Sequence, residues 1–449
     1  MPSALINIGR NGAAAARSSI ELTAQNIANA SNPDYARRSQ TQTELVGSAT
    51  IGVNSADSLG GVRLGDIQRI DSVLVQRQAR ESAADLARTS AELDGLGLAE
   101  TALEESGLYN KLVDYEAALV GLESDPLDPA LRTVALETGR QLADTFRFAD
   151  SALGNARRLV QAEVEAGVEN VRGLAAELGR INREITTARE GSAGHASLLD
   201  ARDATLRQIS DEFGIRASFT DTGAVEVRLS ASSSPLLVDE EGNFNTLSAD
   251  RQADGSYRFR FDTLVFEPDT GAMAGRQAAL VEHARQQEAL DRVAQAVIAS
   301  GNAAQAAGVT PDGSPGQPLF AGTRAGDIGL ALTRGSQLAT AGAGTGAGTG
   351  SRDTAALDSL IAAVGAPGGP VADFDETLLA LSSRTAGLAT TREGLSIIAS
   401  AAEAERLAET GVDLDAEAAN LVRLQQAFEA NSRVIRVAGE IFDTILALD

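Results

Sequence analysis

The sequence has 449 residues but no cysteine, no tryptophan and only two histidines, and aromatic residues make up only 4% of it. Without cysteine the chain forms neither disulfide bonds nor thiolate metal sites. With two histidines it offers few candidates for acid–base catalysis or for zinc ligands. We therefore expect a protein that binds no metal or other cofactor and is not an enzyme.

Positive charge and long apolar runs are also scarce. Lys and Arg number 38 against 62 Asp and Glu, which gives a formal net charge of -24. This charge repels nucleic acid and anionic lipid, so we expect neither as a partner. No apolar run is long enough to span a bilayer, and Asn7, Arg10 and Asn11 interrupt the N-terminal segment. Any export is therefore expected to proceed without a cleaved signal peptide.

Seven-residue periodicity is present at both ends of the chain. The N-terminal series are mostly small or polar: Leu5, Gly12, Ser19 and Asn26, and Ile8, Ala15, Leu22 and Asn29. The C-terminal series are larger: Leu414, Leu421, Phe428, Ile435 and Phe442, with Ala418, Gln425, Ser432, Gly439 and Leu446 beside them. Heptad spacing predicts helices that pack lengthwise, and small residues facing large ones allow close approach. We infer that the terminal helices pair as a coiled coil.

The N-terminal stripe has few large apolar residues, so a hairpin of the two ends buries little apolar surface and is marginally stable alone. We therefore expect the ends to be loosely ordered in the monomer and to gain order by packing against neighbouring subunits. The alternative is that these stripes belong to an ordinary hydrophobic core.

The middle of the chain is predicted to be mainly helical, with one β-rich insertion. Periodicity and capping residues predict helices over Asp71–Asp125, Pro129–Leu153, Val160–Ile185 and Ser197–Gly214. Alternating stretches between 216 and 275, separated by glycine-containing turns, predict a small β domain, after which helices return.

We therefore expect an α+β fold, mainly of long α-helices, with the small β domain inserted in the middle of the chain. The expected parts are a terminal coiled-coil assembly domain (1–40 with 411–449), a helical wall domain (41–215 with 276–410), a small outer β domain (216–275) and a glycine-rich linker (340–351).

Candidate chemistry is weak. His195 lies near Asp200 and Asp203 in the sequence, which leaves a secreted hydrolase as one alternative, but a capped and ion-paired first helical turn explains the same residues. The glycine-rich run after Thr340 lacks the Lys-Ser/Thr ending of a phosphate-binding loop. A coiled-coil adhesin or scaffold is a further alternative.

The segment QNIANASNPDYARR, residues 25–38, resembles the signature of rod, hook and hook-associated proteins of the bacterial flagellum. The matching residues are Asn26, Ile27, Ala28, Asn29, Pro33, Tyr35 and Arg37. Near the other end, Gln426, Ala427, Phe428, Ala430 and Asn431 are similar to the closing helix of the same family. These motifs indicate an axial flagellar protein.

An internal motif points to one branch of that family. The element SLLDARD contains Leu198, Leu199, Asp200, Arg202 and Asp203. It resembles an element of the hook-associated protein 1 branch that rod and hook proteins lack. Hook-associated protein 3 and a hook or rod subunit are the alternatives within the flagellum.

The resemblance implies a structural, motility-related subunit at the hook–filament junction, located outside the cell and passed through the flagellar (type III) export channel. It implies a ring of copies of the chain, contacts with the hook protein and hook-associated protein 3, and an export chaperone on the C-terminal helix. The heptad series and the motifs together predict these assembly residues: Leu5, Ile8, Ala15, Leu22, Asn26, Asn29, Pro33, Tyr35, Leu414, Leu421, Gln425, Phe428, Asn431, Ile435 and Phe442.

Overall fold

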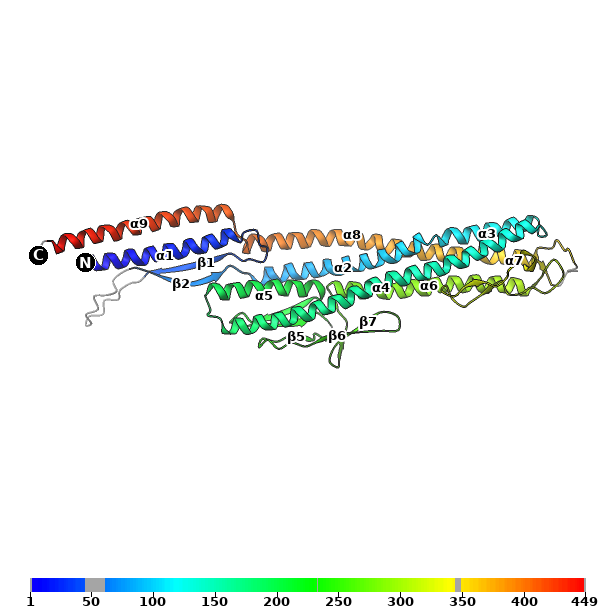
Figure 1. The fold of residues 1–449 in the computed structure, drawn as a ribbon, viewed down its shortest axis with the longest axis horizontal. Helices are drawn as coiled ribbons and strands as arrows, with labels where there is room; N and C mark the ends of the chain where they lie inside the picture. Colours follow the sequence, from blue (N-terminus) through cyan, green and yellow to red (C-terminus); the bar gives the residue numbers. More distant parts are fainter. Residues whose placement is uncertain (1, 45–60, 232, 344–348, 448–449) are drawn as a thin grey trace. The chain divides into compact units, whose positions relative to one another are not determined.

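The computed structural model describes residues 2–44, 61–231, 233–343 and 349–447 (Figure 1). The chain divides into two compact units. Unit 1 comprises Met1–Ala84, Val171–Leu247 and Leu395–Asp449, and unit 2 comprises Asp85–Asn170 and Ser248–Gly394. Residues 344–348 of the predicted glycine-rich linker, and 45–60 of the segment after the first helix, lie outside the described residues. The predicted α+β fold with dominant long helices is confirmed.

Unit 1 contains the paired terminal helices. Helices α1 (Pro2–Ala28) and α9 (Leu414–Leu446) lie side by side (Figure 1), which confirms the predicted pairing. Strands β1 (Arg38–Glu44) and β2 (Val62–Arg69) form an antiparallel hairpin, whose register shifts between Gln40 and Gln42. Helix α5 (Ala193–Glu212) carries the SLLDARD element. The antiparallel sheet β3 (Ile215–Phe219), β4 (Val225–Leu229) and β5 (Leu236–Val238) completes this unit.

Unit 2 is built mainly from helices α3 (Leu108–Ser124), α6 (Ala272–Ala306) and α7 (Ala355–Val364). Helices α2 (Val73–Glu105), α4 (Pro129–Thr187) and α8 (Pro370–Thr410) contribute residues to both units. The strands of unit 2 are β6 (Leu247–Arg251, beginning at the last residue of unit 1), β7 (Tyr257–Phe261), β8 (Leu264–Phe266), β9 (Gly308–Val309), β10 (Phe320–Ala321), β11 (Gly329–Leu330) and β12 (Ala341–Gly342), with the short 3-10 helix η1 (Gly335–Gln337).

A large apolar cluster in the core of unit 2 is shared by its helices and by the loop that carries β10. Tyr115 of α3, Phe146 of α4, Phe320 of β10 and Phe374 of α8 are almost fully buried in it. The rings of Tyr115 and Phe320 meet edge to face at 6.1 Å, an arrangement that aromatic rings favour. Burial raises the pKa of the Tyr115 hydroxyl.

Two helix boundaries differ from the expectation. The helix expected over Asp71–Asp125 is divided into α2 and α3 at Gly107, whose φ of 68° is a left-handed conformation that glycine adopts readily. Conversely, α4 runs through the expected gap after Leu153. Buried Leu153, Ala156 and Val160 continue one apolar face across it, so packing favours an unbroken helix.

The segment expected to form the small β domain contains two sheets. Strands β3, β4 and β5 form one three-stranded sheet, and β6, β7 and β8 form another. In unit 1, Asn182 of α4 fixes the first sheet: its Nδ2 donates to the carbonyls of Val225 and Asp239 at 2.8 Å each. Its Oδ1 also accepts from the Val225 N–H at 3.1 Å.

Within the described ranges, no helix is both long and apolar enough to cross a membrane. The same part of the chain contains no group of His, Cys, Asp and Glu side chains arranged to hold a metal ion.

Unit 2 depends on close contact between α2 and α6 at Gly275. A Cβ placed there would lie 2.0 Å from the Arg88 carbonyl oxygen and 2.8 Å from the Glu92 nitrogen. We expect Gly275→Ala to lower the free energy of unfolding by about 1–3 kcal/mol, because the helices must move apart. Gly97→Ala is the control, since a Cβ there meets nothing within 4 Å. We expect it to be neutral or stabilising by up to about 1 kcal/mol. Equal melting temperatures for the two variants would contradict this account.

Candidate assembly site

Helices α1 and α9 approach each other through glycines of α1. A Cβ on Gly9 would lie 2.8 Å from Cγ1 of Ile435, and a Cβ on Gly12 would lie 2.3 Å from Oδ1 of Asn431. Further along, Nδ2 of Asn420 donates to Oγ1 of Thr23 at 3.1 Å. Residue numbers rise along α1 while those of the contacting residues on α9 fall, so the two helices are antiparallel. The small residues of α1 permit their close packing.

Asn26 connects the end of α1 to β1 as a strand partner would. Its Nδ2 donates to the Arg38 carbonyl at 2.9 Å, and its Oδ1 accepts from the Arg38 N–H at 3.1 Å. The Tyr35 hydroxyl donates to the same Oδ1 at 2.8 Å. Asn26 and Tyr35 are both buried, and burial raises the pKa of Tyr35. The spacing of these residues in the motif thus has a structural role in this chain, because it satisfies the polar groups at the edge of β1.

A buried charge network holds β1 and β2 against α5. The Asp200 carboxylate accepts from Arg38 Nη2 at 2.8 Å and from Arg69 Nε at 2.7 Å. Asp203 accepts from Arg69 Nη2 at 2.6 Å and from Arg202 at 2.7 Å. The side chains of Arg38, Arg69, Arg202 and Asp203 are at most 6% exposed, and that of Asp200 is 12% exposed. Paired in this way, the charges avoid the large cost of isolated buried ions.

The network shifts the ionisation of its members. Burial alone would raise the pKa of Asp203, but Arg202 and Arg69 outweigh it and lower that pKa below the usual range. Burial alone would lower the pKa of Arg69, but Asp203, Asp71 and Asp200 outweigh it and raise that pKa. Both groups therefore stay charged when folded.

The loop between α1 and β1 is bonded to three helices. The Ala36 N–H donates to Oδ1 of Asp200 on α5 at 3.3 Å, and the Arg37 N–H donates to the Thr410 carbonyl of α8 at 2.8 Å. Arg37 Nε also pairs with Glu417 of α9 at 2.6 Å. Asp34 pairs with Arg207 of α5. The motif segment therefore sets where both terminal helices leave the rest of unit 1.

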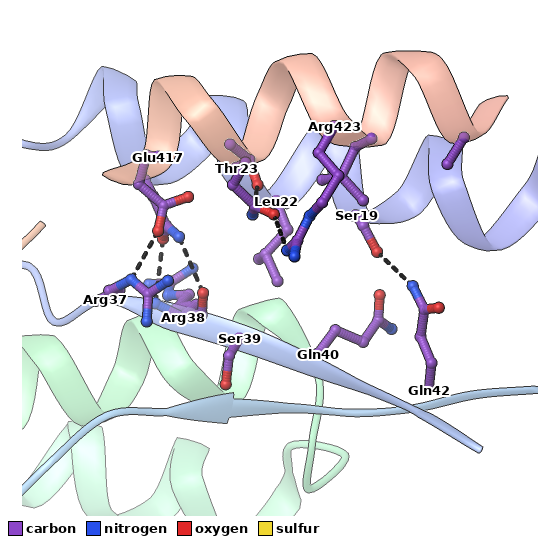
Figure 2. A pocket seen from close by; sticks show the side chains of 14 residues that line it. Ser19, Leu22, Thr23, Arg37, Arg38, Ser39, Gln40, Gln42, Glu417 and Arg423 are labelled. Atoms are coloured by element: carbon purple, nitrogen blue, oxygen red, sulfur yellow. Dashed lines mark hydrogen bonds and ion pairs between the residues drawn. The ribbon is translucent and has the colours of Figure 1, made fainter. Parts of the chain in front are cut away.

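A groove of about 440 Å³ lies between the α1–α9 pair and β1 (Figure 2). Its lining is largely polar, including Ser19 and Thr23 of α1, Gln40 and Gln42 of β1, and Glu417 of α9. Gln42 Nε2 donates to Ser19 Oγ at 3.1 Å across it. Glu417 is 1% exposed, and its Oε2 has no hydrogen-bond partner within the described part of the chain. The groove suits hydrogen bonding rather than catalysis.

The structure places the predicted assembly residues at three levels of burial. Ala15, Leu22, Asn26 and Tyr35 are buried; Ile8, Asn29, Leu421, Asn431 and Ile435 are half-buried; Leu5, Pro33, Leu414, Gln425, Phe428 and Phe442 are exposed. The family-motif residues Asp200, Arg202 and Asp203 are buried in the charge network. Leu198 and Leu199 pack against the small apolar cluster of Ile181, Ile185 and Ala224.

The face of α9 that meets α1 differs from the most apolar series in the sequence. It is centred on Glu417, Leu424, Asn431 and Ala438, which also repeat at sevens. Polar Glu417 and Asn420 lie on this face because Arg37 and Thr23 bond to them. Arg38, Arg69 and Glu417 were not identified from the sequence. Of these three, only Arg38 had a signal in the sequence, because it is the second of two adjacent arginines that follow Tyr35 in the motif.

The two histidines have structural surroundings. Nε2 of His195 lies 3.0 Å from the Thr222 carbonyl, and the carboxylates of Asp200 and Asp203 bond to arginines. His283 is buried with Nε2 2.8 Å from the Gly95 carbonyl, and burial lowers its pKa. The His195–Asp pairing that a hydrolase would need is therefore not formed among the described residues.

Two family models match the chain. The model of the helical domain of flagellar hook-associated protein FlgK matches residues 99–320. The model of the C-terminal region of flagellar basal body rod FlgEFG proteins matches residues 403–448. The first lies over the end of α2, the whole of α3, α4, α5 and α6, and the strands between α5 and α6, and the second over the end of α8 and α9.

The relatives that match this chain in sequence include flagellar hook-associated protein 1 from two bacteria. Flagellar hook-associated protein 1 of Bacillus subtilis (strain 168) is 24% identical over 228 residues, which is 49% of this chain and 44% of that protein. Its Escherichia coli (strain K12) counterpart is 23% identical over 232 residues, which is 51% of this chain and 42% of that protein. The chain thus matches less than half the length of these relatives.

A solved structure is similar over part of the chain. It is the flagellar hook junction protein FlgK from Burkholderia pseudomallei, with a TM-score of 0.49 and 19% sequence identity, covering 55% of this chain and 46% of that one.

The charge network generates a stability prediction. Asp200→Ala would leave Arg38 and Arg69 without their shared carboxylate, and we expect a loss of about 3–5 kcal/mol in the free energy of unfolding of unit 1. The matched control is Asp71→Ala, which removes a carboxylate that is 22% exposed and pairs, among the described residues, with Arg69. Denaturant unfolding and amide exchange at β1 and β2 would measure both. Equal losses in the two variants would refute the central role of Asp200.

The lowered pKa of Asp203 generates a pH prediction. A carboxyl whose pKa falls on folding stabilises the folded state fully above its unfolded pKa of about 4, and this stabilisation is lost as pH falls through the folded pKa. We therefore expect the melting temperature to fall steeply below about pH 4. Asp203→Asn, although less stable at neutral pH, should show a shallower acid slope. A slope unchanged by this substitution would exclude Asp203 as a source of the acid sensitivity.

Proposed function

Because this chain belongs to the flagellar hook-associated protein 1 family, we propose that it is a structural subunit of the hook–filament junction and not an enzyme. The observation that carries the proposal is the antiparallel pair of α1 and α9, which closes one face of α9 and leaves large apolar side chains on its others. Such residues are costly to leave in water and mark an assembly surface.

Two groups of exposed apolar residues lie on the C-terminal part of α9. Val434, Val437 and Ile441 repeat at three and seven residues, so they share one helix face, and they are 39–52% exposed. Phe428 and Phe442 are 39% and 45% exposed. We propose that terminal helices of neighbouring copies cover these residues, so that a ring of copies forms with the helix pairs at its contacts.

The partners and location follow from the same proposal. A junction subunit lies outside the cell on the flagellum, between the hook protein on one side and hook-associated protein 3 on the other. The apolar face of α9 would also suit an export chaperone, since that face needs cover before assembly. The FlgEFG similarity over 403–448 supports the view that α9 is an axial assembly element.

The alternatives have less support. A hydrolase using His195 would need a carboxylate partner for it, and Asp200 and Asp203 are bonded to arginines. A hook-associated protein 3 or a hook or rod subunit would not be expected to match the FlgK helical-domain model over 99–320. A coiled-coil adhesin would be expected to cover the apolar residues of α9 within its own fold.

The test is deletion of the gene followed by complementation. We expect the deletion to leave hooks without filaments and to release flagellin into the medium, and the unaltered chain to restore filaments.

Phe428→Asp should fail to restore filaments, because the contact between copies would bury a carboxylate. It should nevertheless fold normally, because Phe428 is 39% exposed in the monomer. Arg433→Asp, at an exposed polar position of α9 outside the predicted assembly residues, is the control and should restore filaments. Filaments on the deletion strain would refute the junction role.

A further inference from the structure

Unit 2 carries a groove between α6 and α8 that no part of the described chain fills. Its volume is about 400 Å³, and Ala289 and Val293 of α6 and Thr377 of α8 line it. Arg285 and Arg292 form the α6 rim, and Asp373 and Glu376 form the α8 rim. A groove between two helices, with a small apolar floor and charged rims, suits a third helix.

The base of the groove has an unmet hydrogen-bonding group. Gln286 is 6% exposed, and its Nε2 donates to Glu282 at 2.9 Å. Its Oε1 is buried and has no hydrogen-bond partner among the residues that the structure describes. Buried polar groups are normally satisfied, so an occupant of the groove should supply a donor here.

The outer face of α4 has the complementary pattern. Glu137 and Asp144 form an acidic row, and Val134, Gln141 and Phe148 form the row beside it. Val134 is 51% and Phe148 is 58% exposed, which is high for side chains of this size. The Gln141 Oε1 accepts from Lys111, which leaves its Nε2 as a possible donor. This face is apolar and charged in adjacent stripes, as a helix that docks into a groove would be.

The two surfaces match in charge and in spacing. Glu137 and Asp144 are seven residues apart on α4, and Arg285 and Arg292 are seven residues apart on α6. Seven residues of helix rise about 10.5 Å in each case, so both ion pairs can form together. The side chains of Glu137, Asp144 and Arg285 are 50–64% exposed, so they can exchange their present partners at little cost.

The direction of the helices fits copies that point the same way. In one copy α4 and α6 are antiparallel, because Gln287 bonds to Asp150 and Arg276 bonds to Glu163. The α4 of a second copy pointing the same way would also be antiparallel to α6, which places Glu137 opposite Arg292 and Asp144 opposite Arg285. Gln141 then lies between the two ion pairs, within one turn of Gln286.

We propose that the α4 face of one copy docks into the α6–α8 groove of a second copy. The acidic row of α4 pairs with the arginines of α6, the apolar row covers the groove floor, and Gln141 donates to Gln286. The two surfaces differ, so the contact is head-to-tail and repeats from copy to copy, as a ring or helical array requires. The inference rests on the proposed function only in that copies must assemble side by side.

Cysteine cross-linking of the purified full-length chain tests the contact. The natural sequence has no cysteine, so every disulfide comes from the introduced residues. A chain carrying Gln141→Cys and Ala289→Cys should oxidise to a ladder of dimers and larger multiples. The control pair Gln141→Cys and Glu81→Cys, which places one thiol on exposed α2, should cross-link at least about tenfold less. Equal cross-linking of the two pairs, or none in either, would overturn the proposal.

A second test adds charge-reversing substitutions to the chain that carries Gln141→Cys and Ala289→Cys. Glu137→Arg with Asp144→Arg should abolish the ladder by placing like charges together, and so should Arg285→Glu with Arg292→Glu. All four reversals together should restore it, whereas loss of folding would not be rescued. Reversal of the exposed pair Arg77 and Glu81 is the control and should leave the ladder unchanged. Failure of the rescue would overturn the contact without touching the junction role, which filament formation on the complemented deletion strain decides separately.

Discussion

The Asp200 carboxylate is shared by two arginines from different strands and by the backbone of the loop that precedes them. Arg38 of β1 and Arg69 of β2 bond to it, and so does the Ala36 N–H. A buried guanidinium without a counter-charge is unstable, so neither strand can leave α5 without the other. The loop held in this way bonds to α8 and to Glu417 of α9. The position of both terminal helices therefore depends on one ion-paired carboxylate.

This arrangement separates fixed from adaptable surfaces within unit 1. The base of the helix pair is specified by polar bonds of strict geometry, from Asn26 to Arg38 and from Arg37 to Glu417. Beyond it, α1 and α9 pack through glycine and alanine, which bury little surface per residue. A pair that is anchored at one end and weakly held along its length can adjust to neighbouring copies while keeping its direction. This combination would suit the proposed role at a junction between two different structures.

Much of the fold was predictable from the sequence, because its signals are local. Heptad spacing at both ends predicted the pairing of α1 and α9, and Asp128 before Pro129 predicted the start of α4, where the Asp128 carboxylate accepts the Ala130 N–H at 2.6 Å. The face of α9 was not predictable in the same way. Phe428 belongs to its most apolar series but is 39% exposed, whereas Ile435 of the same series and Asn431 of another lie against glycines of α1. Which residues of α9 face α1 depends on the shape of the α1 surface, and the sequence of α9 alone does not contain that information.

The sequence by itself determined that this is a cysteine-free, acidic, largely helical chain with paired ends and the motifs of a flagellar axial protein. It also identified Asp200, Arg202 and Asp203 as a motif, but not what they bind. Only the tertiary structure decided that, because Arg38 and Arg69 are more than 130 residues away in the chain and meet Asp200 only when β1 and β2 pack on α5. Local periodicity follows from neighbouring residues, whereas a buried ion pair needs both partners brought together by the fold.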